Sequence, residues 1–325
     1  KTLRDSAAIR WMALLLLALA MFCAYIFMDI LSPIKDLMQT QRGWDSDAFG
    51  TMQGSETFLN VFVFFLIFAG IILDKMGVRF TGVLSASMMF IGALIKLIGI
   101  SDWFATTGFH DWLNTWWVSL PASAKMACFG FMLFGCGCEM AGTTVSKAIA
   151  KWFKGKEMAL AMGLEMAIAR VGVFAIFSIS PIIASKFGTV VAPIAFCTVL
   201  LLIGLITFIV FTFMDKTLDK QLGVSEEAGE SEEEFKFSDL GKIFSSQVFW
   251  IVALLCVLYY SAIFPFQRYG ANMLQCNLDG ISPSDAANIF RWFPIGAAVI
   301  TPFLGNFLDR KGKGATMLIG GALLL

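Results

Sequence analysis

The sequence predicts an all-α protein whose helices cross a membrane several times. Its 325 residues are 58% apolar and the mean hydropathy is +0.77, which the surface of a soluble domain of this length does not tolerate. Apolar runs of about 20 residues, enough to cross ~30 Å of hydrocarbon, recur along the chain. A short charged motif also occurs twice, each time between two such runs, which indicates a duplicated membrane module.

The apolar runs predict about nine membrane helices. The last of them is still running at Leu325, and the chain starts at Lys1 rather than Met, so we expect it to be trimmed at both ends. The expected spans, correct to within a few residues, are 11–31, 49–73, 80–100, 125–150, 158–184, 190–214, 248–269 and 286–308, with a further one from 314 onward.

The short loops between these spans differ in charge. Those at 75–79, 151–156 and 310–313 are rich in Lys and Arg, whereas those at 36–47, 102–111 and 279–285 carry mostly Asp. Because cytoplasmic loops carry an excess of Lys and Arg, we expect this basic side, with the N-terminus, to be cytoplasmic. The acidic stretch at 215–242 reads as a linker on the same side.

Charge and composition also exclude several functions. The 24 basic and 24 acidic residues balance, so no nucleic-acid partner is indicated. Six of the seven cysteines lie in apolar runs, where a thiol behaves as a small apolar side chain, and the single histidine is His110. We expect no metal site, no cofactor and no enzymatic activity.

The repeated motif carries a family resemblance. Gly70, Asp74, Lys75, Gly77 and Arg79 keep the order Gly, three residues, acid, base, one residue, Gly and a further base. The second copy has Gly305, Asp309, Arg310, Gly312 and Lys313 in the same order. This pattern resembles the cytoplasmic loop motif of the major facilitator superfamily, found there between helices 2 and 3 and, in weaker form, between helices 8 and 9.

The resemblance implies a fold of two pseudo-symmetric six-helix bundles. The expected division is a first bundle at 1–214, a cytoplasmic acidic linker at 215–243 and the truncated start of the second bundle at 244–325. Among the motif residues, those expected to gate the transporter are Asp74, Lys75, Gly77, Arg79, Asp309 and Arg310. An acid at the end of helix 2 can pair with the positive end of a neighbouring helix, and Gly77 allows a tight turn. We expect Asp74 to help close the cytoplasmic face of the outward-open state.

A second, narrower resemblance begins in the fourth span. The loop Lys151-Trp-Phe-Lys-Gly-Lys-Glu157 and the later Ala169-Arg170-Val-Gly172 look like the branch of the superfamily that contains the animal lysosomal dipeptide transporter. The resemblance implies a substrate site in which Glu139 binds an ammonium and Arg170 a carboxylate. Glu165 departs from that branch, where the residue is polar and uncharged.

Glu139 and Arg170 lie at matched depth on two neighbouring spans. Each is about 15 residues from the turn near Lys154, or roughly 20 Å at 1.5 Å per residue, which is close to the bilayer midplane. A lone charge there costs at least about 2.5–3.5 kcal/mol, so a partner is required. One interpretation is an ion pair that locks the hairpin; the other is a site for a zwitterion, since a guanidinium fork matches a carboxylate.

Five further residues are candidates for the substrate site. Tyr25 and Asp29 share a face of the first span and could meet an amine, while Glu56 and Asn60 share a face of the second. Glu165 lies about 140° around its helix from Arg170. A buried carboxyl such as Glu165 or Glu56 could also couple transport to protons. Arg268 after Pro265 could gate the outer mouth or snorkel, and Lys96 is expected to snorkel.

The sequence therefore predicts a secondary transporter that works by alternating access and carries short peptides or similar zwitterions. The alternatives are an organic-anion carrier that uses Arg170 alone and a sensor or scaffold that has lost transport. Expected partners are the lipid bilayer, a small-molecule substrate and protons, and the protein is expected to be a monomer. Because no loop contains an Asn-x-Ser/Thr site, we expect the plasma (bacterial inner) membrane, with the lysosomal membrane as the alternative.

Overall fold

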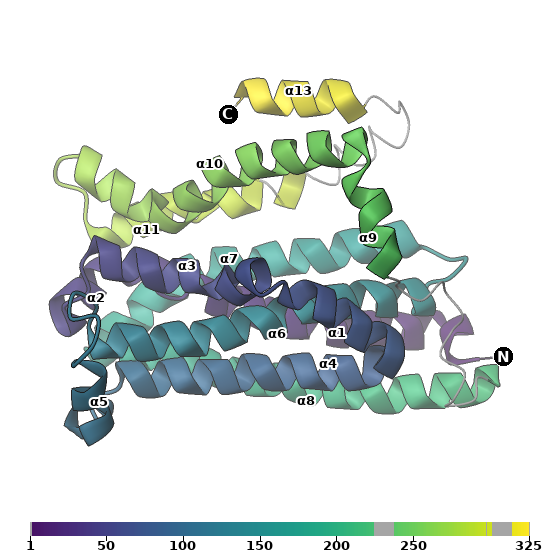
Figure 1. The fold of residues 1–325 in the computed structure, drawn as a ribbon, viewed down its shortest axis with the longest axis horizontal. Coiled ribbons are helices and arrows are strands. Elements are labelled where there is room, and N and C mark those ends of the chain that lie inside the picture. The colour runs from purple at the N-terminus through teal and green to yellow at the C-terminus, as the bar shows by residue number, and fades with distance from the viewer. Residues whose placement is uncertain (1, 224–236, 297, 301–313, 325) are drawn as a thin grey trace.

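The structure is a computed structural model that describes residues 2–223, 237–296, 298–300 and 314–324. These residues form helices and turns without strands, and six of the helical segments are long and apolar enough to cross a membrane. The prediction of an all-α, multi-pass membrane protein is confirmed. Figure 1 shows the long helices lying side by side along one direction.

Most of the described chain forms one bundle of long helices, with shorter helices at its ends. Its helices are α1 (Ala7–Met28), α2 (Lys35–Arg42), α3 (Ser46–Phe62), α4 (Phe65–Ile100), α5 (Gly108–Leu113), α6 (Ala122–Trp152), α7 (Met158–Phe187) and α8 (Val191–Leu222). The short 3-10 turns η1 (Leu3–Asp5), η2 (Ser32–Ile34) and η3 (Phe104–Thr106) lie between or before them.

Glycines pack α4 closely against α6. A Cβ atom added to Gly92 would collide with the backbone of Gly130 and Phe134, and one added to Gly130 would collide with Gly92 and Lys96. Small residues let membrane helices approach closely enough for backbone van der Waals contact. These glycines therefore fix α4 against α6.

The second predicted span is broken in the structure. The prediction of one span over 49–73 is wrong, because α3 ends at Phe62 and α4 begins at Phe65. Between them Phe64 has a φ of 56°, in the left-handed region that a bulky residue rarely adopts. The expected turn at Gly77 is confirmed: its φ of 74° interrupts the helical backbone within α4. Gly77 thus divides α4 into two segments, at the position of the predicted loop between the second and third spans.

Polar contacts at the basic side hold the ends of the first bundle together. The Trp152 indole donates to the fully buried Asp215 at 2.9 Å, and Lys151 reaches the same carboxylate at 2.9 Å. Asp215 lies within α8, which continues to Leu222, beyond the expected bundle end at residue 214. The division of the chain into 1–214, 215–243 and 244–325 stays a prediction.

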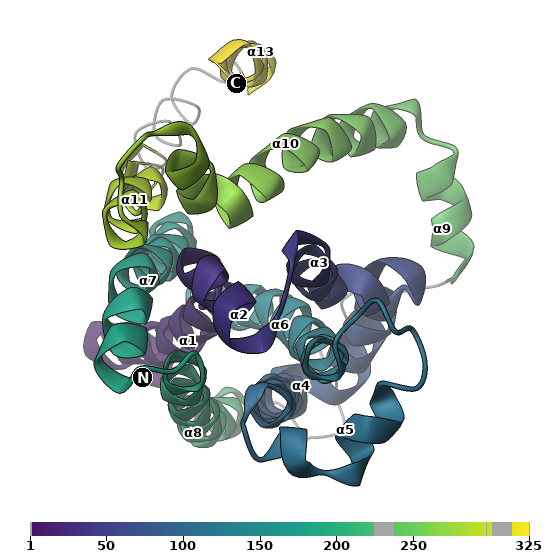
Figure 2. The ribbon, with the colours of Figure 1, turned by 90° about the vertical axis from the view of Figure 1, so that its left-hand side faces the viewer.

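The remaining described helices belong to the second half of the chain. They are α9 (Phe237–Phe244), α10 (Gln247–Asn277), α11 (Pro283–Phe290) and α13 (Gly314–Leu324). The predicted span 286–308 begins with α11 and extends into residues outside the described ranges. Most large apolar side chains over residues 248–260 of α10 are exposed, whereas Gln267, Gly270 and Ala271 near its other end are buried. The second half therefore contacts the first near the acidic side, as Figure 2 shows for α11 beside α7.

Candidate functional site

A cluster of charged side chains joins α10 to the first bundle near the acidic side. Arg268 donates to Glu56 Oε2 at 2.5 Å and to Gln53 Oε1 at 2.7 Å, both on α3. It also donates to the Met28 carbonyl at 3.0 Å and lies 3.5 Å from Asp29 Oδ1. A planar guanidinium has five donors and can satisfy several acceptors at once. Arg268 therefore binds the end of α1 and the middle of α3 rather than snorkelling.

Neighbouring side chains extend this contact between the halves. Gln267 donates to Asp29 Oδ2 at 3.1 Å. Asn272 accepts from Lys35 at 3.2 Å and donates to Asp36 at the same distance. We call Arg268, Gln267, Asn272 and their partners Asp29, Gln53, Glu56, Lys35 and Asp36 the outer cluster.

Three of the predicted substrate residues lie within electrostatic range of a fourth, Tyr25 of α1. They are Arg170 and Glu165 of α7 and Glu139 of α6. Glu139 and Arg170 are exposed, whereas Glu165 is buried, which agrees with its different helix face. Among the described residues no ion pair joins Glu139 to Arg170. We call Tyr25, Glu139, Glu165 and Arg170 the central group, and in the described part of the chain neither Glu139 nor Arg170 has an ion-pair partner.

The other three predicted substrate residues lie elsewhere. Asp29 and Glu56 belong to the outer cluster, where Arg268 occupies their carboxylates. Asn60 lies one turn beyond Glu56 on α3, and its side-chain oxygen and nitrogen are both buried without a hydrogen-bond partner. Asn60 is therefore the one predicted site residue whose polar atoms are enclosed and unused in the described part of the chain.

Two of the predicted gating residues form ion pairs in the structure. Asp74 pairs with Lys147 of α6 at 3.0 Å, and Arg79 lies 3.6 Å from Asp219 of α8. Both pairs are internal to the first bundle. Lys75 is exposed, and Asp309 and Arg310 of the second motif copy lie outside the described residues.

The sequence did not predict that Lys96 is buried in the interior of the bundle. Lys96 of α4 is 1% exposed, and its ammonium lies 3.6 Å from the Phe131 ring centroid and 5.0 Å from that of Phe27. The expectation that Lys96 snorkels is therefore wrong. An ammonium over aromatic faces is stabilised by the ring quadrupoles, most strongly where water is excluded. Neither ring is near Lys96 in sequence, so spacing alone gave no signal for this contact.

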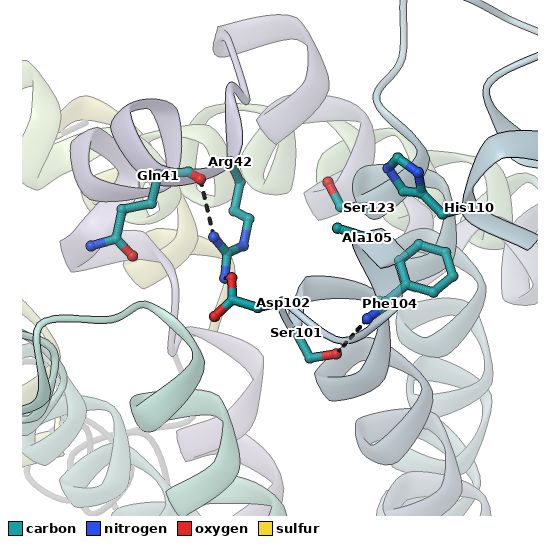
Figure 3. A pocket seen from close by; sticks show the side chains of 9 residues that line it. Gln41, Arg42, Ser101, Asp102, Phe104, Ala105, His110 and Ser123 are labelled. Atoms are coloured by element: carbon teal, nitrogen blue, oxygen red, sulfur yellow. Dashed lines mark hydrogen bonds and ion pairs between the residues drawn. The ribbon is translucent and has the colours of Figure 1, made fainter. Parts of the chain in front are cut away.

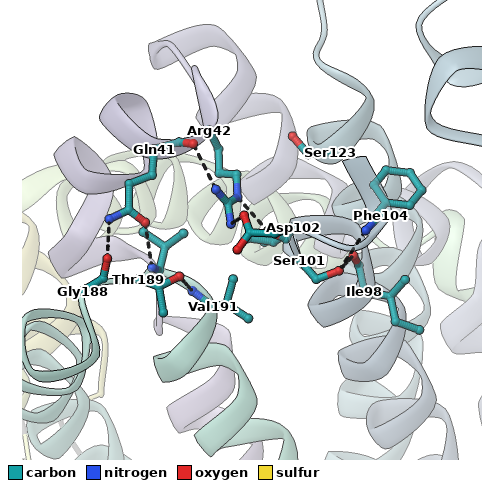
Figure 4. A network of polar contacts seen from close by, with 12 residues as sticks. Gln41, Arg42, Ile98, Ser101, Asp102, Phe104, Ser123, Gly188, Thr189 and Val191 are labelled. Atoms are coloured by element: carbon teal, nitrogen blue, oxygen red, sulfur yellow. Dashed lines mark hydrogen bonds and ion pairs between the residues drawn. The ribbon is translucent and has the colours of Figure 1, made fainter. Parts of the chain in front are cut away.

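A cavity of about 220 Å³ lies near the outer ends of α2 and α4, away from the predicted site residues. Arg42 and Asp102 lie side by side in the lining (Figure 3), and Arg42 donates to this carboxylate at 2.8 Å. Arg42 also donates to the Ile100 carbonyl at 2.7 Å. Figure 4 shows the same network continuing through Gln41, which contacts Gly188 and Val190 at 3.0 Å. These contacts tie α2 to α4 and to the α7–α8 turn, so this region supports the bundle.

Comparison with known proteins gives a family and several relatives. The model of the Major Facilitator Superfamily matches residues 17–325. The human protein named lysosomal dipeptide transporter MFSD1 is 26% identical over 314 residues, which are 94% of this chain and 62% of that protein. The proteins of the same name from Danio rerio and Gallus gallus are 26% and 28% identical, over 94% and 67% of this chain. The chain thus spans less than two thirds of the length of these relatives.

Proposed function

Because the chain belongs to the Major Facilitator Superfamily, we propose that it carries short peptides or similar small zwitterions across a membrane by alternating access. The observation that supports this substrate class is the central group. Arg170 and Glu139 have opposite charges, are both exposed and have no ion-pair partner in the described part of the chain. A solute that carries its own carboxylate and ammonium would satisfy both charges at once.

Each residue of the central group has a distinct role in this proposal. Arg170 presents a planar fork that binds a carboxylate through two parallel hydrogen bonds. Glu139 offers acceptors to the substrate ammonium, and the Tyr25 hydroxyl can donate to one end or accept from the other. Relatives that are named lysosomal dipeptide transporters support the same substrate class.

The outer cluster supports the alternating-access part of the proposal. It joins α10 to α1 and α3 at the acidic side. A contact between the two halves at one side is what alternating access requires of a state closed on that side. In the same state Asp74 is held by Lys147 within its own bundle, so its proposed gating contact would form only when the basic side closes.

The proposed function is tested by uptake into liposomes that contain the full-length protein. A panel of dipeptides is measured with and without a pH gradient, which also shows whether protons are coupled to transport. Dipeptides should raise the thermal stability of the purified protein and simple organic anions should not. Stabilisation by anions alone would favour the organic-anion carrier, and tight binding without flux would favour a sensor.

The role of Arg170 has its own test. Arg170→Lys keeps the positive charge but loses the fork, so dipeptide affinity should fall at least about tenfold, the equivalent of one lost charged hydrogen bond of about 1.5 kcal/mol. Arg4→Lys at the basic end of the bundle is the matched control and should leave affinity unchanged. Unchanged affinity in Arg170→Lys would exclude carboxylate recognition by this fork.

A further inference from the structure

We infer that the broken end of α3, together with the Asn60 side chain, binds a monovalent cationic group. The starting point is the break itself. The Val63 amide donates to the Leu59 carbonyl at 3.2 Å, and the helix then stops. The carbonyls of Asn60, Val61 and Phe62 therefore accept no main-chain hydrogen bond in the described structure.

The break lies deep in the membrane. Val63 precedes the Gly77 turn by about 14 residues, or roughly 20 Å along the helix direction, which is the depth estimated for Glu139 and Arg170. Free carbonyls at such a depth are tolerated only where protein or a water-filled cavity satisfies them. In transporters, interrupted helices of this kind supply carbonyl oxygens and a negative helix end to bound cations.

Asn60 provides an independent observation. Its side chain lies on the last turn of α3, with both polar atoms buried and without a partner. A buried amide without a hydrogen bond costs about 1–3 kcal/mol in proteins. A cationic group that contacts the amide oxygen would recover part of this cost, which makes Asn60 a candidate ligand.

Helix packing places an acid at the same level. A Cβ atom on Gly135 of α6 would collide with the Glu56 carbonyl, so α3 and α6 touch at these two positions. Both helices run from the acidic side toward the basic side. One turn beyond this contact α3 carries Asn60 and α6 carries Glu139. Glu139 is exposed and has no ion pair in the described chain.

The donors at this level are oxygens: an amide, main-chain carbonyls and one carboxylate. Oxygen donors suit hard cations, and the negative end of the α3 dipole adds to the attraction. No group of three or more His, Cys, Asp or Glu residues capable of holding a metal occurs in the described part of the chain. A single carboxylate fits one positive charge, supplied either by an alkali ion or by the ammonium of a substrate.

The experiment measures thermal unfolding of the full-length protein in sodium, potassium and choline chloride at equal ionic strength. Sodium should raise the melting temperature above that in choline, and Asn60→Ala should abolish the difference. Asn60→Asp adds a carboxylate and should lower the half-saturating sodium concentration; it also serves if Asn60→Ala folds poorly. Asn277→Ala, at the exposed end of α10, is the matched control and should respond as the wild type does.

A second set of measurements tests whether the bound positive charge is the ammonium of a substrate. If sodium has no effect, Asn60→Ala should weaken binding of a dipeptide with a free amine by about tenfold or more, and leave an N-acetylated dipeptide unaffected. This arm rests on the proposed function, whereas the sodium arm does not. If the wild type binds no dipeptide, the proposed function fails, and the cation site is then judged by the effect of sodium on the melting temperature alone. Equal behaviour of Asn60→Ala and wild type in every arm overturns the inference.

Discussion

Replacing Arg268 by Ala should open the acidic side of the protein. In the structure this guanidinium contacts Glu56, Gln53, Asp29 and the Met28 carbonyl, and its side chain is 12% exposed. Removing one partner of a buried ion pair costs about 3–5 kcal/mol, because the other charge stays buried and unpaired. The contact joins the two halves, so this cost falls only on the state closed at the acidic side.

The expected size follows from that cost. About 1.4 kcal/mol corresponds to a tenfold change in an equilibrium constant, so Arg268→Ala should shift the ratio of open to closed acidic side by about 10²- to 10³-fold. Arg268→Lys should shift it less, because one charged hydrogen bond to Glu56 can still form. The lysine cannot contact Gln53 and the Met28 carbonyl at the same time.

The assay measures the distance between spin labels at Thr40 on α2 and Asn277 on α10, both exposed positions on the acidic side. The exposed cysteines Cys256 and Cys276 are replaced first. Arg268→Ala should populate longer distances. Arg42→Ala is the control, since its partner Asp102 lies in the same half, and it should leave the distribution unchanged. An unaltered distribution in folded Arg268→Ala protein would refute the reasoning.

Two further predictions concern the basic side. Trp152→Phe keeps an aromatic ring but removes the indole hydrogen bond to the buried Asp215. In thermal unfolding it should destabilise the protein by about 1.5–3 kcal/mol. The control Trp112→Phe, at an exposed ring, should change stability by less than about 0.5 kcal/mol. The pKa of Glu157 is lowered by its own backbone amide and then by Arg10, so its stabilising contribution is present above the unfolded-state pKa and lost as pH falls through the folded one. The melting temperature of Glu157→Gln should therefore fall less between neutral pH and pH 4 than that of wild type or Asp279→Asn, and parallel curves would contradict the assignment.

Hydropathy acts residue by residue, so the sequence was sufficient for the all-α, multi-pass class but not for the break between α3 and α4. The substrate site of Tyr25, Asp29, Glu56, Asn60, Glu139, Glu165 and Arg170 stays a prediction, and the structure places Glu139, Glu165 and Arg170 within electrostatic range of Tyr25. Depth along a helix follows from counting residues, and two helices joined by a short loop bring equal depths together. Counting does not give the rotation of each helix, so it left open whether Glu139 and Arg170 form an ion pair.

The contacts of Arg268 were beyond sequence reasoning for a related reason. Its partners Glu56 and Gln53 are more than 200 positions away, and whether they meet depends on how the two halves are oriented. Lys96 was misjudged because a lysine near the end of an apolar run usually reaches the interface, while its actual environment is set by Phe27 and Phe131 from two other helices. The break at Phe64 has no Gly or Pro to predict it.

The helix α3 connects the two sets of residues on which transport would depend. Glu56 and Gln53 hold Arg268 in the outer cluster, and Asn60 lies one turn further toward the break. A ligand shifts a conformational equilibrium only by its differential affinity for the two states. A cationic group bound at Asn60 and Glu139 fixes the end of the same short helix whose preceding turn contacts Arg268. Occupancy of the proposed site and closure of the acidic side would therefore be coupled through α3, without any contact between the ligand and Arg268.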